Sequence, residues 1–346
     1  MSIPIANIYY LLLYAWRHVE RKDLVQVGNA GKSDLLNLLA HVFLLEVRRL
    51  LTRGLAREYL AIEEPVTGLR GKLDIGNTLK RSLLRHGHTW CQFDELLYDI
   101  PRNRIIKAVL RLLTRVAALD DDNSHAARRL YAKLDAVRDV ALYHSLFRGL
   151  QSHRLVREYD FALRLARLIS DSVILDRTGD SARFVDFRED EATMHRLFED
   201  FVFNFYALEC PDIQPRRRTI DWFDAKGSEE AMLHLPRMHT DVYLSVGERR
   251  IVLDTKFYAA PLGGQYREGV RSENLYQLFA YVENAAPAEP GASVEGVLLY
   301  AATERTFAFS YVLKGRRLDA RTLDLTQDWR AIHRDLLSIP ATRRSA

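Results

Sequence analysis

Two aspartates and a lysine, Asp241, Asp254 and Lys256, are the residues of this sequence best suited to chemistry. They fall in two short segments, 240–246 and 250–258, in which apolar and polar residues alternate as they do in half-buried β-strands. Carboxylates and an amine gathered at the end of a strand are typical of sites that hold a divalent cation or move a proton. The spacing of the three residues decides whether they meet.

Gly247 and Glu248 separate the two segments and suit a two-residue turn, with glycine at the first central position. Counting outward from this turn places Asp241 directly opposite Asp254 on the adjacent strand. Residues opposite each other share a face, with Cβ atoms about 4.5–5.5 Å apart. Lys256 lies two residues beyond Asp254 and therefore points to the same face.

Two carboxylates this close repel each other, and the pKa of one of them rises unless a positive charge intervenes. Oxygen ligands without thiolate or imidazole suit magnesium or manganese, so we expect Asp241 and Asp254 to bind Mg²⁺. Such a cation can polarise a phosphate ester and help to activate a water molecule. Lys256 can orient or deprotonate that water, or stabilise the charge that develops.

The alternative is a solvated strand face that carries a salt bridge, and the bare spacing of the three residues favours it. However, residues 251–253, Ile-Val-Leu, are apolar on both faces of the strand, which is typical of a buried central strand. Burying Asp254 and Lys256 at the end of such a strand is costly unless they serve a purpose. The flanking residues therefore favour the cation site.

Three further residues are candidates for the same site. Gln277 and Tyr281 are four residues apart on a predicted helix and share one face of it, either as site residues or as a plain polar stripe. Glu199, on an earlier predicted helix, is either a third metal ligand or a solvated partner for nearby Arg196.

The elements that must position these residues follow from the spacing of apolar side chains. The first half is expected to be largely helical, with helices at 35–51, 103–118, 126–140 and 155–175 and an extended segment at 57–65. The second half is expected to be α/β with a mixed sheet, with helices at 194–206 and 271–284 and strands at 240–246, 250–258 and 294–300. The boundary falls between about 150 and 185, and we divide the chain into domains 1–160 and 161–346.

The composition limits the function classes. With a net charge of +4 and a pI of about 8.9, the chain is mildly basic, which suits a nucleic-acid partner without requiring one. Cys91 and Cys210 support neither a disulfide framework nor a metal site, so we expect the protein in the reducing cytoplasm. The apolar run 8–16 is too short to span a bilayer, and we expect a buried element there rather than a signal peptide.

The segment 28–33, Gly-Asn-Ala-Gly-Lys-Ser, is similar to a phosphate-binding loop. A Walker A loop needs a glycine five residues before its second glycine, and that position holds Gln26. A helix N-terminus capped by Ser33 explains the segment better, so we expect no nucleotide to bind this chain.

Five motifs along the chain resemble the McrC family, the nuclease subunits of McrBC modified-DNA restriction systems. They are the N-terminal run 3–16, Gly-Leu-Arg-Gly-Lys at 68–72, Asn-Arg-Ile-Ile-Lys at 103–107, Leu-Pro-Arg-Met-His-Thr-Asp at 235–241 and Asn-Leu-Tyr-Gln-Leu at 274–278. The resemblance covers essentially the whole chain, and the motifs are specific as a set.

The resemblance implies an α+β, largely helical N-terminal domain followed by an α/β PD-(D/E)XK restriction-endonuclease-like domain with a central mixed sheet. Asp241, Asp254 and Lys256 fall on that motif residue by residue, with Thr240 at the place of its proline. The family match extends to the accessory residues. Gln277 and Tyr281 match the QxxxY element of RecB-like nucleases, and Glu199 sits where many such folds have a helical acid.

The resemblance also implies partners. McrC-like proteins work with McrB, an AAA+ GTPase hexamer that reads modified cytosine in double-stranded DNA, so GTP would bind the partner and Mg²⁺ would bind this chain. Arg70 and Lys72 would be candidate contacts with that ring. The implied activity is Mg²⁺-dependent cleavage of methylcytosine-containing DNA, weak without the partner, together with stimulation of its GTPase. Two alternatives stay open: a non-cleaving activator of the GTPase, and an autonomous RecB-like repair nuclease.

Overall fold

The computed structural model describes residues 3–24, 35–148, 156–176, 181–258, 262–263, 269–302 and 306–341. The chain forms two compact units. The helical unit contains Ser33–Val185, and the sheet unit contains Asp186–Ala346 together with Met1–Lys32. The boundary expected between residues 160 and 161 instead falls inside a helix, Val156–Asp171, and the first residues of the chain belong with its second half.

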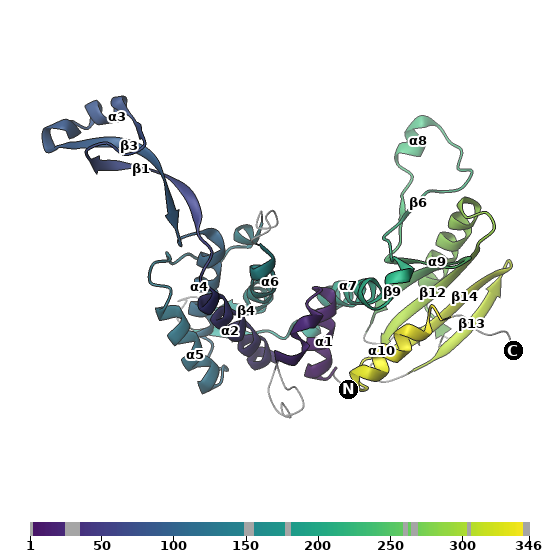
Figure 1. The fold of residues 1–346 in the computed structure, drawn as a ribbon. Helices are drawn as coiled ribbons and strands as arrows, with labels where there is room; N and C mark the ends of the chain where they lie inside the picture. The colour runs from purple at the N-terminus through teal and green to yellow at the C-terminus, as the bar shows by residue number, and fades with distance from the viewer. Residues whose placement is uncertain are drawn as a thin grey trace. The chain divides into compact units, whose positions relative to one another are not determined.

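The helical unit combines a cluster of helices with a long β-hairpin (Figure 1). Its helices are α2 (Leu35–Arg53), α3 (Ile75–Lys80), α4 (Pro101–Leu113), α5 (Asp121–Ala132) and α6 (Val156–Asp171), with the 3-10 helices η3 (Leu83–His86) and η4 (His144–Phe147). Its strands are β1 (Glu58–Thr67), β2 (Lys72–Leu73) and β3 (His88–Leu97), in the order β1-β3-β2, and the short pair β4 (Val173–Leu175) and β5 (Ala182–Phe184). This agrees with the expected α+β, largely helical character.

A buried asparagine ties both roots of the β1–β3 hairpin to the helices. Asn103, fully buried on α4, donates from Nδ2 to the carbonyl oxygens of Ala56 at 3.0 Å and Tyr98 at 2.8 Å. Its Oδ1 accepts from the hydroxyl of Tyr159 on α6 at 2.9 Å. Because every polar atom of this amide is bonded, the hairpin leaves the helix cluster from a fixed base.

The largest departure from the expected helices is the segment predicted at 126–140. Helix α5 ends at Ala132, and the residues after it leave the helix. The carbonyl oxygens of Val137 and Val140 accept instead from Lys107 Nζ at 2.6 Å and Arg111 Nη2 at 2.9 Å, both on α4. Tertiary hydrogen bonds from α4 thus replace those of a longer helix.

The sheet unit is built on a five-stranded mixed sheet in the order β13-β14-β12-β9-β8. The strands are β8 (Val242–Val246), β9 (Arg249–Phe257), β12 (Ser293–Ala302), β13 (Ala308–Leu313) and β14 (Arg316–Asp324); β12 runs parallel to β9 and β14, and the outer pairs are antiparallel. The helices are α1 (Ile5–Ala15), α7 (Glu191–Glu209), α8 (Glu229–Leu233), α9 (Ser272–Ala285) and α10 (Trp329–Ser338). The remaining elements are η1 (Val19–Leu24), η5 (Phe187–Glu189), η6 (Pro211–Ile213), η7 (Ala286–Ala288), β6 (Thr219–Ile220), β7 (Met238–His239), β10 (Leu262–Gly263) and β11 (Gly269–Val270).

The N-terminal apolar run is α1, and it packs in the sheet unit. Asn7 donates from Nδ2 to the carbonyl oxygens of Leu325 at 2.7 Å and Gln327 at 2.8 Å, and the Tyr14 hydroxyl donates to Glu209 of α7. The expectation of a buried element is confirmed, because Asn7–Ala15 are all buried. The part of the chain that the structure describes contains no helix long and apolar enough to cross a membrane.

The phosphate-loop-like segment at 28–33 lies outside the described residues. The other expected elements are present: α2, α4, α7 and α9, the extended segment as β1, and the three strands as β8, β9 and β12. The segment 155–175 divides into α6 and β4. Strands β13 and β14 and helix α10 were not anticipated.

Gly296 lies where β12 meets β14 and α9, and there is no space there for a side chain. A Cβ at this position would lie 2.7 Å from Leu318 Cδ2 and 2.8 Å from Leu278 Cδ2, both fully buried side chains. We therefore expect Gly296→Ala to lower the free energy of unfolding by about 1–3 kcal/mol, measured by chemical denaturation. Gly227→Ala, which meets only ordinary contacts from 3.5 Å, is the matched control. Equal stability of the two variants would contradict this packing.

Candidate active site

The two strands that carry the candidate residues form a hairpin with the expected register. The pairs run from Val246 opposite Arg249 to Val242 opposite Leu253, so the turn lies at residues 247 and 248. Gly247 has a φ of 57°, in the left-handed region that favours glycine. The predicted register is confirmed, and the paired ladder stops one step before Asp241 and Asp254.

Asp241 immediately precedes β8 and is held by the neighbouring strand. Its Oδ2 accepts from the backbone nitrogen and from the hydroxyl of Thr255, both at 2.7 Å. The carbonyl oxygen of Thr255 in turn lies 3.1 Å from Nε2 of His195 on α7. Thr255 was not among the predicted residues, because its side chain alternates away from the face of Asp254. Its backbone and hydroxyl nevertheless fix the Asp241 carboxylate.

Asp254 and Lys256 form a buried ion pair near the end of β9. Asp254 is 1% exposed and Lys256 is 9% exposed. Lys256 Nζ lies 2.6 Å from Asp254 Oδ2, yet this oxygen accepts no well-directed hydrogen bond from the described residues. A cation that binds this carboxylate would therefore share it with the Lys256 ammonium.

Helix α9 extends the site through the ammonium group of Lys256. Lys256 Nζ donates to Gln277 Oε1 at 3.1 Å, and Gln277 Nε2 donates to the Tyr281 hydroxyl at 2.7 Å. Tyr281 is buried against the core between α9 and the sheet, so the two residues are not a solvated polar stripe. The predicted helical face thus orients the lysine.

The charges of the site shift its pKa values. Burial, reinforced by the charges of Asp241 and Glu199, raises the pKa of Asp254 to about 7 against the opposing effect of Lys256. Burial alone would lower the pKa of Lys256. The neighbouring Asp254 carboxylate opposes this effect and outweighs it, so the pKa of Lys256 is raised above its usual value. Burial and the charge of Asp241 also raise the pKa of Glu199. Negative charge is therefore in excess here, and a cation would relieve it.

Glu199 lies near the other acids but has its own partner. Its Oε1 is 3.1 Å from Arg217 Nη2, and Arg196 instead donates to Thr193 Oγ1 at 3.4 Å. The expected alternative of an Arg196 partner is therefore wrong. Among the described residues, no three His, Cys, Asp or Glu side chains come together as a group that could hold a metal ion. Asp254, Lys256, Gln277 and Tyr281 are joined by direct contacts. Asp241 is bonded to Thr255, and Glu199 is paired with Arg217.

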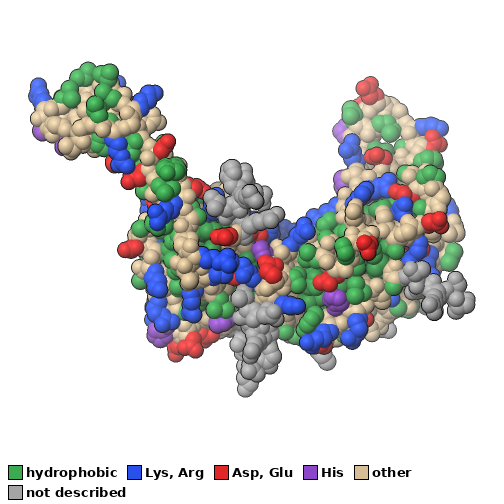
Figure 2. Space-filling model, in the orientation of Figure 1, with side chains coloured by type: hydrophobic (Ala, Val, Ile, Leu, Met, Phe, Trp, Pro, Cys, Tyr) green, Lys and Arg blue, Asp and Glu red, His purple; other side chains and the backbone are tan. Residues whose placement is uncertain are grey.

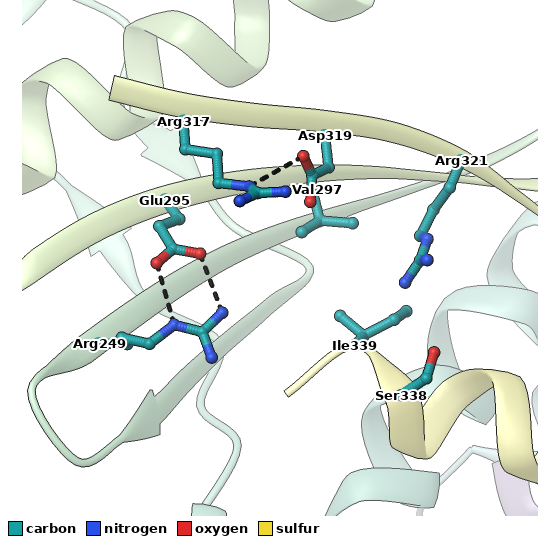
Figure 3. Close-up of a pocket in the computed structure, with 8 residues that line it drawn as sticks. All are labelled: Arg249, Glu295, Val297, Arg317, Asp319, Arg321, Ser338 and Ile339. Atoms are coloured by element: carbon teal, nitrogen blue, oxygen red, sulfur yellow. Dashed lines mark hydrogen bonds and ion pairs between the residues drawn. The ribbon is translucent and has the colours of Figure 1, made fainter. Parts of the chain in front are cut away.

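A separate pocket lies at the opposite end of β9, with a volume of about 230 Å³ (Figure 3). There Arg249 binds Glu295 through two hydrogen bonds of 2.9 Å, and Arg317 Nε donates to Asp319 at 3.1 Å. Arginines neutralise both acids of this pocket, so it does not repeat the carboxylate–lysine arrangement near the end of β9.

A mixed sheet that carries a buried Asp254–Lys256 pair, with the half-buried Asp241 nearby, defines an α/β domain with an acidic site, and comparison with known proteins identifies its context. Residues 6–301 match a family described as "McrBC 5-methylcytosine restriction system component". The chain is 30% identical over 338 residues to the "Type IV methyl-directed restriction enzyme EcoKMcrBC" of Escherichia coli K12, with 97% of each chain covered. The chain therefore belongs to the McrBC family of restriction system components.

A solved structure has the same fold. A chain of the "refined half-complex from tetradecameric assembly of Thermococcus gammatolerans McrB AAA+ hexamers with bound McrC" matches with a TM-score of 0.59 and 19% identity, covering 97% of this chain and 76% of that one. The expected mixed-sheet architecture is thus shared with a solved protein.

Proposed function

We propose that this chain is the DNA-cleaving subunit of a GTP-dependent restriction complex that acts on methylcytosine-containing double-stranded DNA. The observation that carries the proposal is the buried Asp254–Lys256 pair with Asp241 beside it, at 2.6 Å between Lys256 Nζ and Asp254 Oδ2. Burying these charges costs stability that a purely structural strand would retain. Within a restriction-system family, hydrolysis of a DNA phosphodiester is the chemistry that explains them.

The carboxylate oxygens of Asp241 and Asp254 would hold Mg²⁺, with Glu199 as a third ligand. They are hard oxygen donors, and Asp254 Oδ2 is buried without a directed hydrogen bond. When bound, the cation would polarise the scissile phosphate and lower the pKa of a water molecule. The site suits Mg²⁺ because its donors are carboxylate oxygens and because negative charge is in excess there.

Lys256 would act on the reacting water and on the developing charge. Gln277 and Asp254 hold its ammonium from two sides, at 3.1 Å and 2.6 Å, so it has a fixed direction before substrate arrives. A positioned cation stabilises the phosphorane-like charge without reorganising during the reaction. Tyr281 contributes by fixing the Gln277 amide.

The β1–β3 hairpin would contact the GTPase partner. The solved relative has McrC bound to McrB AAA+ hexamers, and the surface of the hairpin suits it for such a contact. Its far end exposes large apolar side chains, with basic side chains among them (Figure 2). The most exposed of them are Leu69, Ile75, Leu79 and Leu84, each at least 59% exposed. The Arg70 guanidinium stacks over Phe93 at 3.9 Å and lies 3.8 Å from Glu95, yet its side chain is 52% exposed. Lys72 is exposed as well, so a partner can reach both. Apolar surface of this kind is typical of a docking element.

This hairpin also supports a second candidate function, a non-cleaving activator of the GTPase. One experiment decides between the two. The purified chain is incubated with methylated or unmethylated plasmid, Mg²⁺ and GTP, with and without the partner ring, and cleavage and GTP hydrolysis are followed in the same tubes. A chelator in a parallel set removes the metal.

We expect cleavage only of methylated plasmid, only with the partner, GTP and Mg²⁺ together. Stimulated GTP hydrolysis without any cleavage would show that the chain is an activator alone. Cleavage of unmethylated plasmid at full rate by the chain alone would instead show an autonomous nuclease of the RecB-like kind.

Gln277→Ala is expected to reduce the rate of cleavage by about 10- to 100-fold, because outer-shell partners hold reacting groups in place. The effect should fall on kcat more than on KM, because Gln277 contacts Lys256 rather than DNA. Tyr281→Phe removes only the hydroxyl that accepts from Gln277. It should reduce the rate of cleavage by less than Gln277→Ala does. A rise in KM with an unchanged kcat would contradict the positioning role.

Metal affinity is expected to depend on pH through Asp254, whose pKa is raised to about 7. Below this pH the carboxyl group holds a proton that the cation must displace. The affinity for Mn²⁺ should therefore fall about tenfold per pH unit below about 7 and level off above it. Titration of Mn²⁺ by electron paramagnetic resonance between pH 5.5 and 8.5 measures this. A flat profile over that range would contradict metal binding by an Asp254 whose pKa is near 7.

A further inference from the structure

Arg217 bridges two acids beside the candidate active site. Its Nη2 lies 3.1 Å from Glu199 Oε1 and 2.5 Å from Asp200 Oδ1, and its guanidinium lies 5.0 Å from the ring centroid of Phe203. All three partners are on α7. The Arg217 side chain is nevertheless 49% exposed, so one side of the guanidinium faces solvent.

Helix α7 places Glu199 on the face that packs against β9. His195, one turn earlier on α7, contacts the carbonyl oxygen of Thr255 at 3.1 Å. Residues four apart lie on the same face of a helix, so Glu199 follows His195 along that face. Thr255 also holds Asp241 through two hydrogen bonds of 2.7 Å. Glu199 is thus directed to the side of the site where Asp241 stands.

The backbone fixes Arg217 at the same edge of the sheet. Arg216 exchanges two hydrogen bonds with Tyr243 of β8, its nitrogen donating at 2.9 Å and its oxygen accepting at 2.8 Å. The next residue, Arg217, therefore stands close to the point where Asp241 precedes β8. On the proposed function, a DNA strand whose phosphodiester reaches Asp241 and Asp254 would bring neighbouring phosphates to this edge.

We propose that Arg217 exchanges Glu199 for a DNA phosphate and thereby couples DNA binding to metal binding, an inference that rests on the proposed function. In the free protein Arg217 holds Glu199, and no group of three acids is assembled among the described residues. Arginine binds phosphate as well as carboxylate in the same forked geometry, so a backbone phosphate can take its place. Glu199 then becomes available as the third oxygen ligand beside Asp241 and Asp254.

Two consequences follow from this exchange. DNA raises the affinity for the cation, and the cation raises the affinity for DNA by the same factor, because coupling between two binding sites is reciprocal. The free protein therefore binds the metal weakly until DNA is in place.

The test measures Mn²⁺ affinity by electron paramagnetic resonance on the full chain, with and without a short duplex whose integrity is checked on a gel. Arg217→Gln is expected to bind Mn²⁺ about three- to tenfold more tightly than wild type without DNA, because it frees Glu199 and removes a nearby positive charge. The increase in Mn²⁺ affinity on adding DNA should be smaller in this variant than in wild type, by that same factor. Arg217→Lys should keep part of the coupling.

Matched variants separate the exchange from a general charge effect. Arg196→Gln removes one positive charge from the exposed side of α7 and leaves the partner of Glu199 in place. We expect it to change the Mn²⁺ affinity by less than twofold. Glu199→Gln should lose the added gain from DNA. If Arg217 meets a phosphate, Arg217→Gln should also reduce the slope of log affinity for DNA against log salt by about one.

The inference is overturned if Arg217→Gln matches wild type in Mn²⁺ affinity without DNA, or if its gain from DNA equals that of wild type. An unchanged salt slope also overturns it. The failure of the proposed function looks different: Asp254→Asn would then bind Mn²⁺ as wild type does. If Asp254→Asn abolishes binding while Arg217→Gln changes nothing, only the exchange falls.

Discussion

Asp254→Asn is expected to reduce DNA cleavage by at least about 10³-fold, while stimulation of the partner's GTP hydrolysis stays at the wild-type level. The carboxylate is 1% exposed, and the amide that replaces it has nearly the same shape but only one acceptor oxygen and no charge. Loss of a metal ligand removes several kcal/mol of transition-state stabilisation, which corresponds to this factor. The GTPase should be unaffected because Asp254 lies in the sheet unit and the hairpin lies in the helical unit.

The matched control is Asp319→Asn, which removes an acid from β14 of the same sheet. Asp319 lines the separate pocket, where it accepts from Arg317 at 3.1 Å. Both variants are compared with wild type in plasmid cleavage, GTP hydrolysis and thermal unfolding. If Asp254→Asn still cleaves methylated plasmid within tenfold of wild type, or if Asp319→Asn loses as much, the catalytic assignment is wrong.

The site was predictable to the extent that it depends on strand geometry. The alternation around Gly247 sets a two-residue turn, and a side-chain period of two then leaves a single register for Asp241, Asp254 and Lys256. The structure has that register, with Val242 opposite Leu253. Nothing in this inference needs tertiary contacts, which is why the sequence alone was sufficient.

The contacts that depend on packing between distant elements could not be predicted in this way. Arg217 reaches Glu199 because a loop pinned to β8 passes beside α7, and sequence spacing alone favoured Arg196, only three residues from Glu199. Helix α1 joins the sheet unit because nearly all of it is apolar, so it needs burial on every side, but no local pattern states which partner provides it.

The architecture shows the same division between local and distant information. Strand β13 escaped detection because it is exposed along nearly its whole length and so lacks the buried face of a typical strand. Strand β14 escaped detection because five of its nine residues are Arg or Asp. The units divide after Val185, at the edge of the range of about 150 to 185 expected from the sequence, and not at residue 160. The place of the first 32 residues in the second unit escaped detection, because it follows from tertiary contacts and not from a change in composition.

Lys256→Met is expected to reduce cleavage by about 10²–10³-fold while the protein still binds Mn²⁺, which separates the role of the lysine from that of the metal ligands. Methionine retains a long apolar side chain in a position that is 9% exposed and removes only the charge and its hydrogen bonds. Without the lysine, the pKa of Asp254 should rise further, because Lys256 is what opposes the effect of burial. Metal binding is therefore compared at pH 8.5, above the wild-type pKa of Asp254 of about 7.

At that pH the loss of a positive charge 2.6 Å from Asp254 Oδ2 should leave Mn²⁺ affinity equal to or above that of wild type, even though cleavage is lost. Lys256→Arg keeps the charge but places a wider, planar group between Asp254 and Gln277, so it should restore only a small part of the rate. If Lys256→Met loses metal binding together with cleavage, the lysine supports the carboxylates and does not act on the reaction. If it cleaves as wild type does, another group stabilises the developing charge, and Arg216 and Arg217 beside β8 become the residues to test.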